Sequence, residues 1–427
     1  MSLLILLGGM IVLIAIGVPI AFSIGLSSVV YMIFWNPDFL IMIPQRIWMG
    51  ANSYILIALP LFIFAGQLMN SGGLTKRIVD FSLYLVRPIR GGLAEVNVVA
   101  SMIFGGISGS SVADTSALGS LLIPQMEERG YSTGFSAGVT VASSTMGMVI
   151  PPSIPMLIYA MTTDVSIGQL FLAGVVPGIL IGLTQIVIVY VISRRRNYHP
   201  VAVRFDVKDF LRTARDASLA LIMPVLIVTT VSFGVCTATE SAGIAVLYAF
   251  VVGKFVYREL KWKELEVMLK RTVVTTSVVM IIISFSMVFT WILAIDNIPL
   301  LVADAFESLQ LGTNWILLIL VIMILIAGTF IDVSPCIVLL TPLLLPVMQR
   351  LGINALQFGV IMIVGMAVGL VTPPIGMCLN ATTKICRLPI MEIFRNAIPL
   401  VLCNVAVLLV VTFFPGVYMW LPKLLMQ

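Results

Sequence analysis

Polar groups that could bind ions occur at two corresponding places in an otherwise apolar chain. Residues 147–153 read Gly-Met-Val-Ile-Pro-Pro-Ser, and residues 369–375 read Gly-Leu-Val-Thr-Pro-Pro-Ile, at an offset of 222 (373 − 151 = 222). A Pro-Pro step interrupts an α-helix, because proline lacks an N–H and clashes with the preceding turn. Each interruption exposes carbonyls that suit a hard cation and helix N-termini that suit an anion. Two broken membrane helices in corresponding positions predict a transporter's binding site.

A second polar interruption precedes each Pro-Pro step. Residues 105–111 are rich in glycine and serine and lie within the apolar segment 93–129, and residues 328–335 lie likewise within 313–350. The apolar arms of the first segment have only about 14 residues, too few to span a membrane, so it predicts a re-entrant hairpin. Irregular backbone at that depth is tolerated only where it lines a polar cavity. The hydroxyl and carboxylate groups around these interruptions are Ser108, Ser110, Ser111, Thr115, Ser143, Ser144, Thr145, Ser153, Thr329, Asp332, Ser334 and Thr372.

Two carboxylates, Asp114 and Asp332, lie near the expected hairpin tips. An ionisable residue at membrane depth is costly and is therefore a functional candidate. Asp332 could ligate Na⁺ or cap a half-helix, and we favour capping or support of the site for both residues. Glu240 is expected in a helix N-cap region. Residues 91–193 contain a single basic residue, Arg129, so an anionic substrate would need helix N-termini, hydroxyls and co-bound cations to offset its charge.

The composition indicates a polytopic membrane protein. The 427 residues are 60% hydrophobic and 10% charged, with a mean hydropathy of +1.14, whereas soluble proteins carry about 25% charged residues. The net charge of +5 is concentrated in loops and does not predict nucleic-acid binding. The one histidine, His199, lies in a polar loop, which argues against a metal site and against an enzyme with a histidine-based triad. The five scattered cysteines are expected to be reduced.

The chain divides into two halves with the same plan. Residues 1–73 and 216–295 are interpreted as scaffold helices, 93–193 and 296–427 as transport parts with a hairpin and a broken helix, and 194–215 as a cytoplasmic linker. Basic stretches at 74–92 and 258–271 are expected to be surface arm helices. The expected elements are helices near 3–18, 20–35, 54–70, 167–193, 217–235, 239–257, 273–295 and 397–420, with broken helices at 134–162 and 356–384.

Charge and crossing number predict the same orientation. No Lys or Arg occurs between residues 272 and 349, whereas basic residues cluster at 76–90, 194–215, 254–271 and 384–395, so the positive-inside rule places the 296–312 loop outside. Five crossings per half make the second half inverted, with the first hairpin on the cytoplasmic side and the N-terminus outside. No basic residue precedes the first apolar segment, so it is interpreted as a retained helix, not a signal peptide. The sequence thus predicts an all-α membrane protein with an inverted repeat, two re-entrant hairpins and two broken helices.

Four sequence runs resemble the large membrane subunit of tripartite ATP-independent periplasmic (TRAP) transporters. They are residues 59–66, 105–119, 150–155 and 238–242, and the resemblance extends over essentially the whole chain. It implies a sodium-driven elevator that imports an organic carboxylate, such as a C4-dicarboxylate, sialic acid or a related sugar or keto acid. It also implies a soluble periplasmic binding protein, a small four-helix membrane subunit, expected here as a separate chain, and a bacterial inner-membrane location.

The resemblance also assigns candidate site residues. It implies sodium ions around the first hairpin and broken helix and around the second pair, with the substrate between them. The implied sodium-binding residues are Ser108, Gly109, Ser111, Ser144, Thr145, Gly328, Phe330, Asp332, Gly369 and Thr372. The implied substrate-binding residues are Ser110, Pro152, Ser153, Ser334, Pro374 and Gly376.

Three other functions remain open from the sequence. A stand-alone divalent-anion/sodium symporter shares the hairpin design but needs no binding protein. An intramembrane enzyme would need a catalytic motif, which the sequence lacks. A passive channel would show no counter-ion stoichiometry. The sequence does not specify which carboxylate is carried.

Overall fold

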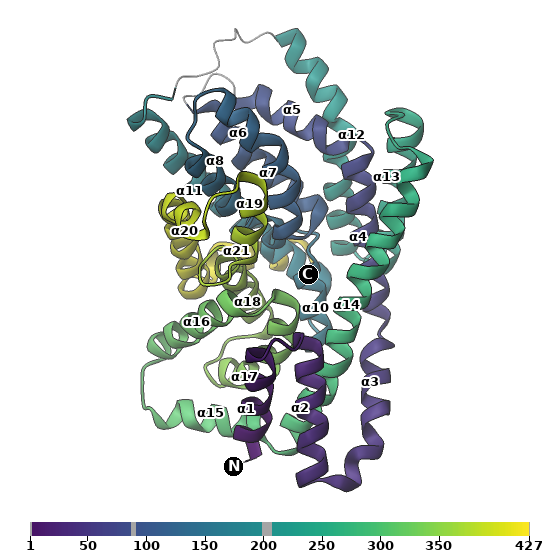
Figure 1. Cartoon of the computed structure of the whole chain (residues 1–427), viewed down its shortest axis with the longest axis vertical. Helices are drawn as coiled ribbons and strands as arrows, with labels where there is room; N and C mark the ends of the chain where they lie inside the picture. Colours follow the sequence, from purple (N-terminus) through teal and green to yellow (C-terminus); the bar gives the residue numbers. More distant parts are fainter. Residues whose placement is uncertain (1, 87–90, 199–206, 427) are drawn as a thin grey trace.

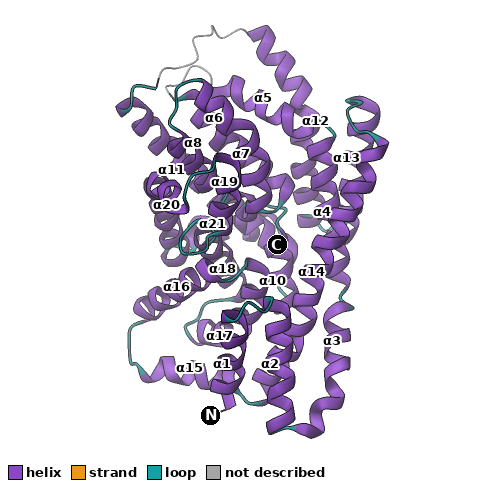
Figure 2. Cartoon of the chain, in the orientation of Figure 1, coloured by secondary structure: helices purple, strands orange, loops and turns teal. Residues whose placement is uncertain are grey.

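The computed structural model describes residues 2–86, 91–198 and 207–426, and this part of the chain is built from helices without a strand (Figure 2). Eight of the described helices are long and apolar enough to cross a membrane. The prediction of an all-α polytopic membrane protein is therefore confirmed. These spans are Tyr54–Ser71, Ile167–Arg195, Val207–Ser232, Ala238–Val256, Trp262–Ile295, Thr313–Phe330, Val333–Arg350 and Ile390–Phe413.

One group of helices contains continuous spans. In Figure 1 these helices lie together along one side and the lower end of the molecule, with α14 crossing α2, α3 and α4 and with α13 beside α4. Gly17, with φ +90°, and Pro19 separate the first two helices, and a 3₁₀ turn follows α2 at Pro37–Met42. The bounds are α1 Ser2–Ala15, α2 Ile20–Trp35, α3 Ile43–Ala51, α4 Tyr54–Ser71, α13 Ala238–Val251 and α14 Trp262–Ile295.

Both expected hairpins are helix–turn–helix pairs. The first consists of α6 (Gly92–Ser108) and α7 (Ser111–Glu128), joined at Gly109, whose φ of +60° suits a residue without a side chain. The second consists of α16 (Thr313–Phe330) and α17 (Val333–Arg350). Its arms diverge more, because α16 packs on α18 while α17 packs on α10, α14 and α15. Each arm of the second hairpin is long enough to cross the membrane. That this hairpin enters and leaves the membrane on the same side therefore stays a prediction.

Both Pro-Pro steps break helices. The first lies between α8–α9 (Thr133–Ser143, Met146–Val149) and α10 (Ile154–Thr163), which bend by 40°. The second lies between α18 (Ala355–Gly369) and α19 (Met377–Cys386). Pro151-Pro152 and Pro373-Pro374 are both cis. The inverted relation of the two halves stays a prediction.

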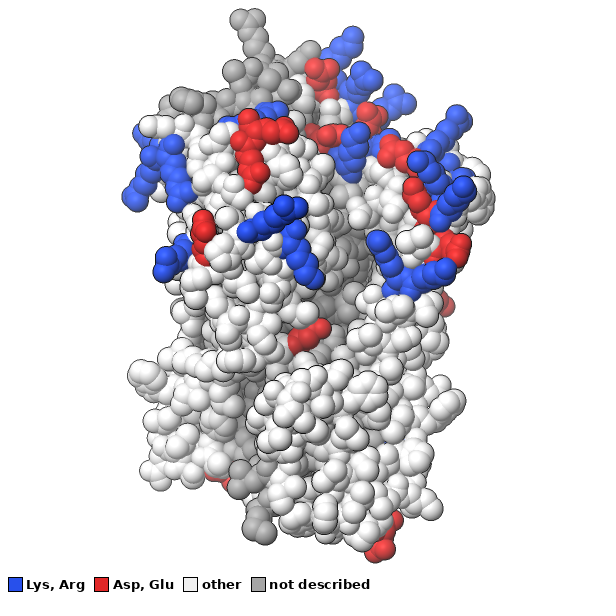
Figure 3. Space-filling view, in the orientation of Figure 1, with Lys and Arg blue, Asp and Glu red and all other residues white. Residues whose placement is uncertain are grey.

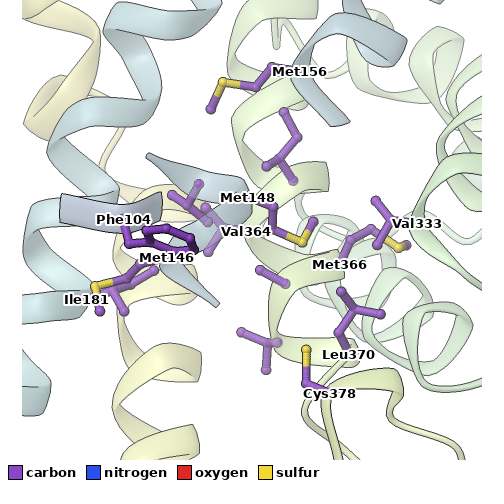
Figure 4. Packing of buried hydrophobic residues seen from close by; sticks show 14 of the residues in the cluster. Phe104, Met146, Met148, Met156, Ile181, Val333, Val364, Met366, Leu370 and Cys378 are labelled. Atoms are coloured by element: carbon purple, nitrogen blue, oxygen red, sulfur yellow. The ribbon is translucent and has the colours of Figure 1, made fainter. Parts of the chain in front are cut away.

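The remaining helices connect and cover these elements. Buried apolar side chains, among them Phe104, Met146, Met148 and Met366, pack together in the interior (Figure 4). The bounds are α5 Leu74–Val86, α11 Ile167–Arg195, α12 Val207–Ser232, α15 Ile298–Ser308, α20 Ile390–Phe413 and α21 Gly416–Leu425, with a π-helical turn at Val252–Val256.

Several expected elements differ from the structure. The prediction of a separate surface helix at 258–271 is wrong, because most of that stretch is the start of α14. Residues 262–295 contain no glycine or proline that would break a helix. The expected linker is shorter, since α12 begins at Val207, and α15 lies in the expected outer loop. The last segment is two helices, with the break at Pro415. His199 and the end of the first arm helix, residues 87–90, fall outside the described residues.

Charge marks the two ends of the molecule. Basic side chains gather around its upper end in Figure 3, and few charged side chains are visible at the lower end. The first helix lies near the lower end (Figure 1). This distribution agrees with the orientation that the positive-inside rule predicts, with the N-terminus away from the basic side.

Close backbone contact between α8 and α20 predicts an effect on stability. A Cβ added to Gly138 would lie 2.9 Å from the backbone nitrogen of Ala397, so Gly138→Ala should force the helices apart and cost about 1–3 kcal/mol. We expect a lower midpoint of thermal unfolding of the detergent-purified protein. Gly243→Ala is the control, since nothing lies within 4 Å of the added carbon. Equal midpoints for the two variants would contradict the contact.

Candidate functional site

The first hairpin tip rests directly on the first broken helix. The amide of Ile154, the first residue of α10, donates a hydrogen bond to the carbonyl oxygen of Gly109 at 3.2 Å. A Cβ on Gly109 would lie 2.9 Å from the Pro152 oxygen, and one on Gly106 would lie 3.1 Å from the Pro151 oxygen. Glycine is required here because the two backbones touch. The tip therefore satisfies part of the backbone that the Pro-Pro step leaves open.

An incompletely bonded carboxylate lies beside this contact. The hydroxyl of Ser108 donates to Oδ1 of Asp114, while Oδ2 of Asp114 has no hydrogen-bond partner among the described residues, and the side chain is fully buried. A Cβ on Gly147 would lie 2.4 Å from that oxygen, so Oδ2 faces the backbone just before the break. The buried hydroxyl of Ser111 also lacks a described partner. Free oxygens of this kind are suitable ligands for a hard cation.

Helix caps distinguish the two hairpin carboxylates. Asp332 caps α17, since its Oδ1 accepts a hydrogen bond from the amide of Val333 at 2.7 Å. In the first hairpin the N-cap is Ser110, the residue 222 positions earlier (332 − 110 = 222). Asp114 is therefore not the N-cap of α7, and instead supports the tip through Ser108. The expected N-cap region at Glu240 is confirmed as a capping box with Thr237.

The second hairpin repeats the backbone contact with glycine on both sides. A Cβ on Gly369 would lie 2.7 Å from the carbonyl carbon of Gly328. Thr372 donates its hydroxyl to the carbonyl of Val368 at 2.8 Å. The Phe330 side chain is largely exposed, so only its backbone remains available to the site. This half thus presents carbonyls and the Asp332 carboxylate, with fewer hydroxyls than the first half.

A buried polar network holds the first break from behind. Gln185 of α11 donates to the carbonyl of Ala142 at 2.9 Å and to the side chain of Asn404 at 2.8 Å, and Asn404 of α20 donates to the Thr145 hydroxyl at 3.1 Å. All of these side chains are buried. Sequence reasoning missed Gln185 and Asn404. The sequence feature that could have identified them is an amide side chain within an apolar span, because such a side chain needs a hydrogen-bond partner in the membrane.

The two hairpin tips share one cavity of about 600 Å³. First-turn residues of α7, α10, α17 and α19 line it, so four helix N-termini meet at one space. Helix N-termini carry partial positive charge, which favours an anion. The cavity contains the predicted residues Gly109, Ser110, Ser111, Asp332 and Ser334, together with Ile63, Arg271, Thr275 and Val279 from α4 and α14.

Sequence reasoning did not find the α4 and α14 wall of this cavity. Those helices carry no Pro-Pro step or glycine-rich tip, and only the folded arrangement brings them opposite the hairpins. The other predicted residues do not line the cavity. Among them, Ser144, Thr145 and Ser153 are buried, and their hydroxyls bond to nearby carbonyls, at 2.6 Å for Ser153 to Met148. Ser108, Pro152, Gly328, Phe330, Gly369, Thr372, Pro374 and Gly376 belong to the tips and breaks around it.

The architecture is that of known membrane transporters. The structure of the Alcanivorax borkumensis YdaH transporter superposes with a TM-score of 0.65 over 89% of this chain and 88% of that one, at 15% identity. Neisseria gonorrhoeae MtrF superposes with a TM-score of 0.55 over 87% and 83% of the two chains, at 12% identity. These likenesses concern the fold alone.

Sequence comparison defines the family. The profile of the tripartite ATP-independent periplasmic transporter DctM component matches residues 7–417. The C4-dicarboxylate TRAP transporter large permease protein DctM of Pseudomonas aeruginosa is 37% identical, over 94% of both chains. The sialic acid TRAP transporter large permease protein SiaM of Vibrio cholerae is 36% identical, over 96% of this chain and 95% of that protein. The chain therefore belongs to the family of large membrane components of TRAP transporters. It is a multi-pass transporter permease, as the sequence motifs predicted.

Proposed function

We propose that this chain imports an organic carboxylate together with sodium ions, in the inner membrane of a bacterium. The observation that carries the proposal is the cavity in which four helix N-termini meet beside incompletely bonded oxygens. The N-termini favour the carboxylate group, and the oxygens favour a cation. Relatives named for C4-dicarboxylates, sialic acid and 2,3-diketo-L-gulonate support an organic acid as the cargo.

Charge balance in the cavity supports the proposed sodium coupling. Partial charges at helix N-termini amount to roughly half an elementary charge each and weaken with distance, and Asp332 adds a negative charge to the same wall. A cation near Asp114, Ser108 and Ser111 would neutralise the buried carboxylate and strengthen the positive field at the tips. Loading of the cation and loading of the carboxylate would then favour each other.

Delivery and partners follow from family membership. A soluble periplasmic binding protein would deliver the carboxylate, and a small four-helix membrane subunit would accompany this chain. One relative, the isethionate TRAP transporter permease protein DctMQ of Oleidesulfovibrio alaskensis, is 34% identical over 97% of this chain, which covers 66% of that protein. Its additional length supports a second membrane component that other members carry separately.

Movement of the cavity would proceed as an elevator. The hairpins and broken helices form one packed unit, since α8 packs on α20, α18 on α16 and α10 on α17. The spans α4, α13 and α14 contain no break of this kind and would stay fixed in the lipid. A groove between the two sets is visible in Figure 3, with both basic and acidic side chains around its upper end.

A reconstitution experiment tests the proposed function. We expect Na⁺-driven carboxylate uptake into liposomes only when this chain, the small subunit and the binding protein are all present. The measurement is uptake of labelled succinate and sialic acid with and without each partner and with Na⁺ replaced by K⁺. Uptake by the chain alone would instead support a stand-alone symporter, and uptake without Na⁺ would overturn the coupling.

Substitution of the hairpin carboxylates should weaken sodium dependence. We expect Asp332→Ala and Asp114→Asn each to raise the half-saturating Na⁺ concentration about tenfold, which corresponds to about 1.4 kcal/mol. Glu240→Ala is the control, because this exposed carboxylate caps α13 away from the cavity. Uptake against Na⁺ concentration measures the effect. If Asp332→Ala matches the parent, that carboxylate acts only as a helix cap.

Disulfide trapping should distinguish an elevator from rocking of the two halves. Gly168→Cys with Ser232→Cys joins α11 to α12, where the would-be Cβ of Gly168 lies 3.2 Å from the Ser232 Cα. In a background without exposed native cysteines, we expect oxidation of this pair to stop transport reversibly. The matched pair Gly134→Cys with Asn396→Cys joins the two transport parts, 3.2 Å apart between Cβ and Cγ, and should leave transport largely intact. Each pair also joins the first half of the chain to the second, so a block of transport by both pairs would indicate rocking of the halves.

A further inference from the structure

The cavity at the hairpin tips continues along α4 and α14. A second cavity of about 460 Å³ is lined by Gln67, Asn70 and Ser71 at the end of α4 and by Lys270, Arg271 and Thr275 of α14. Arg271 and Thr275 line both cavities. The two spaces therefore meet at these side chains, and a polar wall leads from the tips toward the end of α4, where the basic arm α5 begins.

Arg271 lies on the face of α14 that looks at the tips. Residues 271, 275 and 279 all line the tip cavity, and a spacing of four places them on one side of a helix. Arg271 is the single basic side chain among the residues that line this cavity. It opposes the N-caps Ser110 and Asp332 across the space.

The Arg271 side chain makes no ion pair with another described residue. Its neighbour Lys270 pairs with Glu266 at 2.7 Å, and Arg77 pairs with Glu259 at 2.9 Å. An exposed arginine without a carboxylate partner keeps all five of its donors available, in a planar arrangement that matches a carboxylate. Because Arg271 lines both cavities, its donors lie beside the space that an anion would occupy.

We propose that Arg271 is the residue of the fixed helices that receives the substrate carboxylate on its way from the hairpin tips to the cytoplasm; this inference rests on the proposed function. The tips hold an anion through partial charges and co-bound cations. When the cations leave, the field at the tips weakens, whereas the charge of Arg271 is permanent. A carboxylate near both groups then shifts toward Arg271 and into the second cavity.

The proposed action of Arg271 also depends on the position of the hairpin unit. Since α14 belongs to the unbroken spans, a moving hairpin unit meets Arg271 only when the tips stand opposite it, as they do in this structure. The substrate would be exposed to this full positive charge at the release step and not at the loading step. Arg271 would therefore favour release into the cytoplasm without tightening the loaded state.

The electrostatic effect of Arg271 can be measured in the absence of substrate, with charged reagents that react with a nearby cysteine. Thr275→Cys is introduced after the partly exposed Cys236, Cys386 and Cys403 are replaced by serine. The assembled complex then reacts with anionic sulfonatoethyl and cationic trimethylammonioethyl methanethiosulfonate. With Arg271→Gln added, we expect the anionic-to-cationic rate ratio to fall about five- to tenfold. Lys263→Gln, on the same helix but outside both cavities, should leave the ratio unchanged. A ratio insensitive to Arg271→Gln, or equally sensitive to Lys263→Gln, overturns the assignment.

Transport kinetics then locate the effect at the release step. In complexes without the Thr275 substitution, we expect Arg271→Gln to raise the half-saturating succinate concentration on the cytoplasmic face several-fold during exchange. Arg271→Lys should restore part of it, and the half-saturating concentration of loaded binding protein outside should stay near the parent value. Equal changes on both faces would contradict a release role. A parent complex that carries neither succinate nor sialic acid would count against the proposed function, whereas the reagent ratio would still decide whether Arg271 attracts anions.

Discussion

Backbone groups without partners inside a membrane are the constraint on which this structure depends. Each unpaired N–H or C=O costs several kcal/mol in hydrocarbon, and the chain contains two Pro-Pro steps that leave such groups open. The hairpin tips resolve the problem by direct contact, as in the bond from the Ile154 amide to the Gly109 carbonyl. Glycines at the tips allow that contact, and the apolar core behind the breaks keeps water away. The polar interior can therefore exist only where tips and breaks are assembled together.

The two halves satisfy this constraint with different chemistry. Positions related by the offset of 222 hold Ser110 and Asp332 as helix caps, and Asp114 and Cys336 one turn further along. The first half is rich in hydroxyls and buries a carboxylate, whereas the second relies on carbonyls, glycine contacts and a capping carboxylate. The two tips thus present different sets of oxygens to the cavity. If both bind cations as proposed, the two sites would differ in strength.

Under the proposed function, charge placement would separate binding from release. The first hairpin and its broken helix contain no basic side chain near the tip, so helix N-termini and cations would have to hold an anion there. The full positive charge of Arg271 is on the opposite wall, which belongs to the unbroken spans. In the proposed mechanism, bound cations would help to hold the anion at the tips and Arg271 would receive it, so transfer between the two walls would depend on the cations. A buried arginine within the hairpins would instead hold the substrate after the cations had left.

The sequence by itself determined the elements whose cause is local. Proline and glycine at an offset of 222 placed both breaks and both tips, since these residues act on their own backbone. Apolar segment lengths indicated most of the spans, and the motifs indicated the family. The continuous α14 was not predicted, because its basic start has the composition of a surface helix, although residues 262–295 contain no glycine or proline that would end a helix. Only the tertiary structure decided which groups meet. Gln185 and Asn404 bond across 219 positions of the chain, and Arg271 faces tips more than 60 residues away on one side and about 160 on the other. Such pairings depend on how whole helices pack, and no local pattern of residue types encodes them.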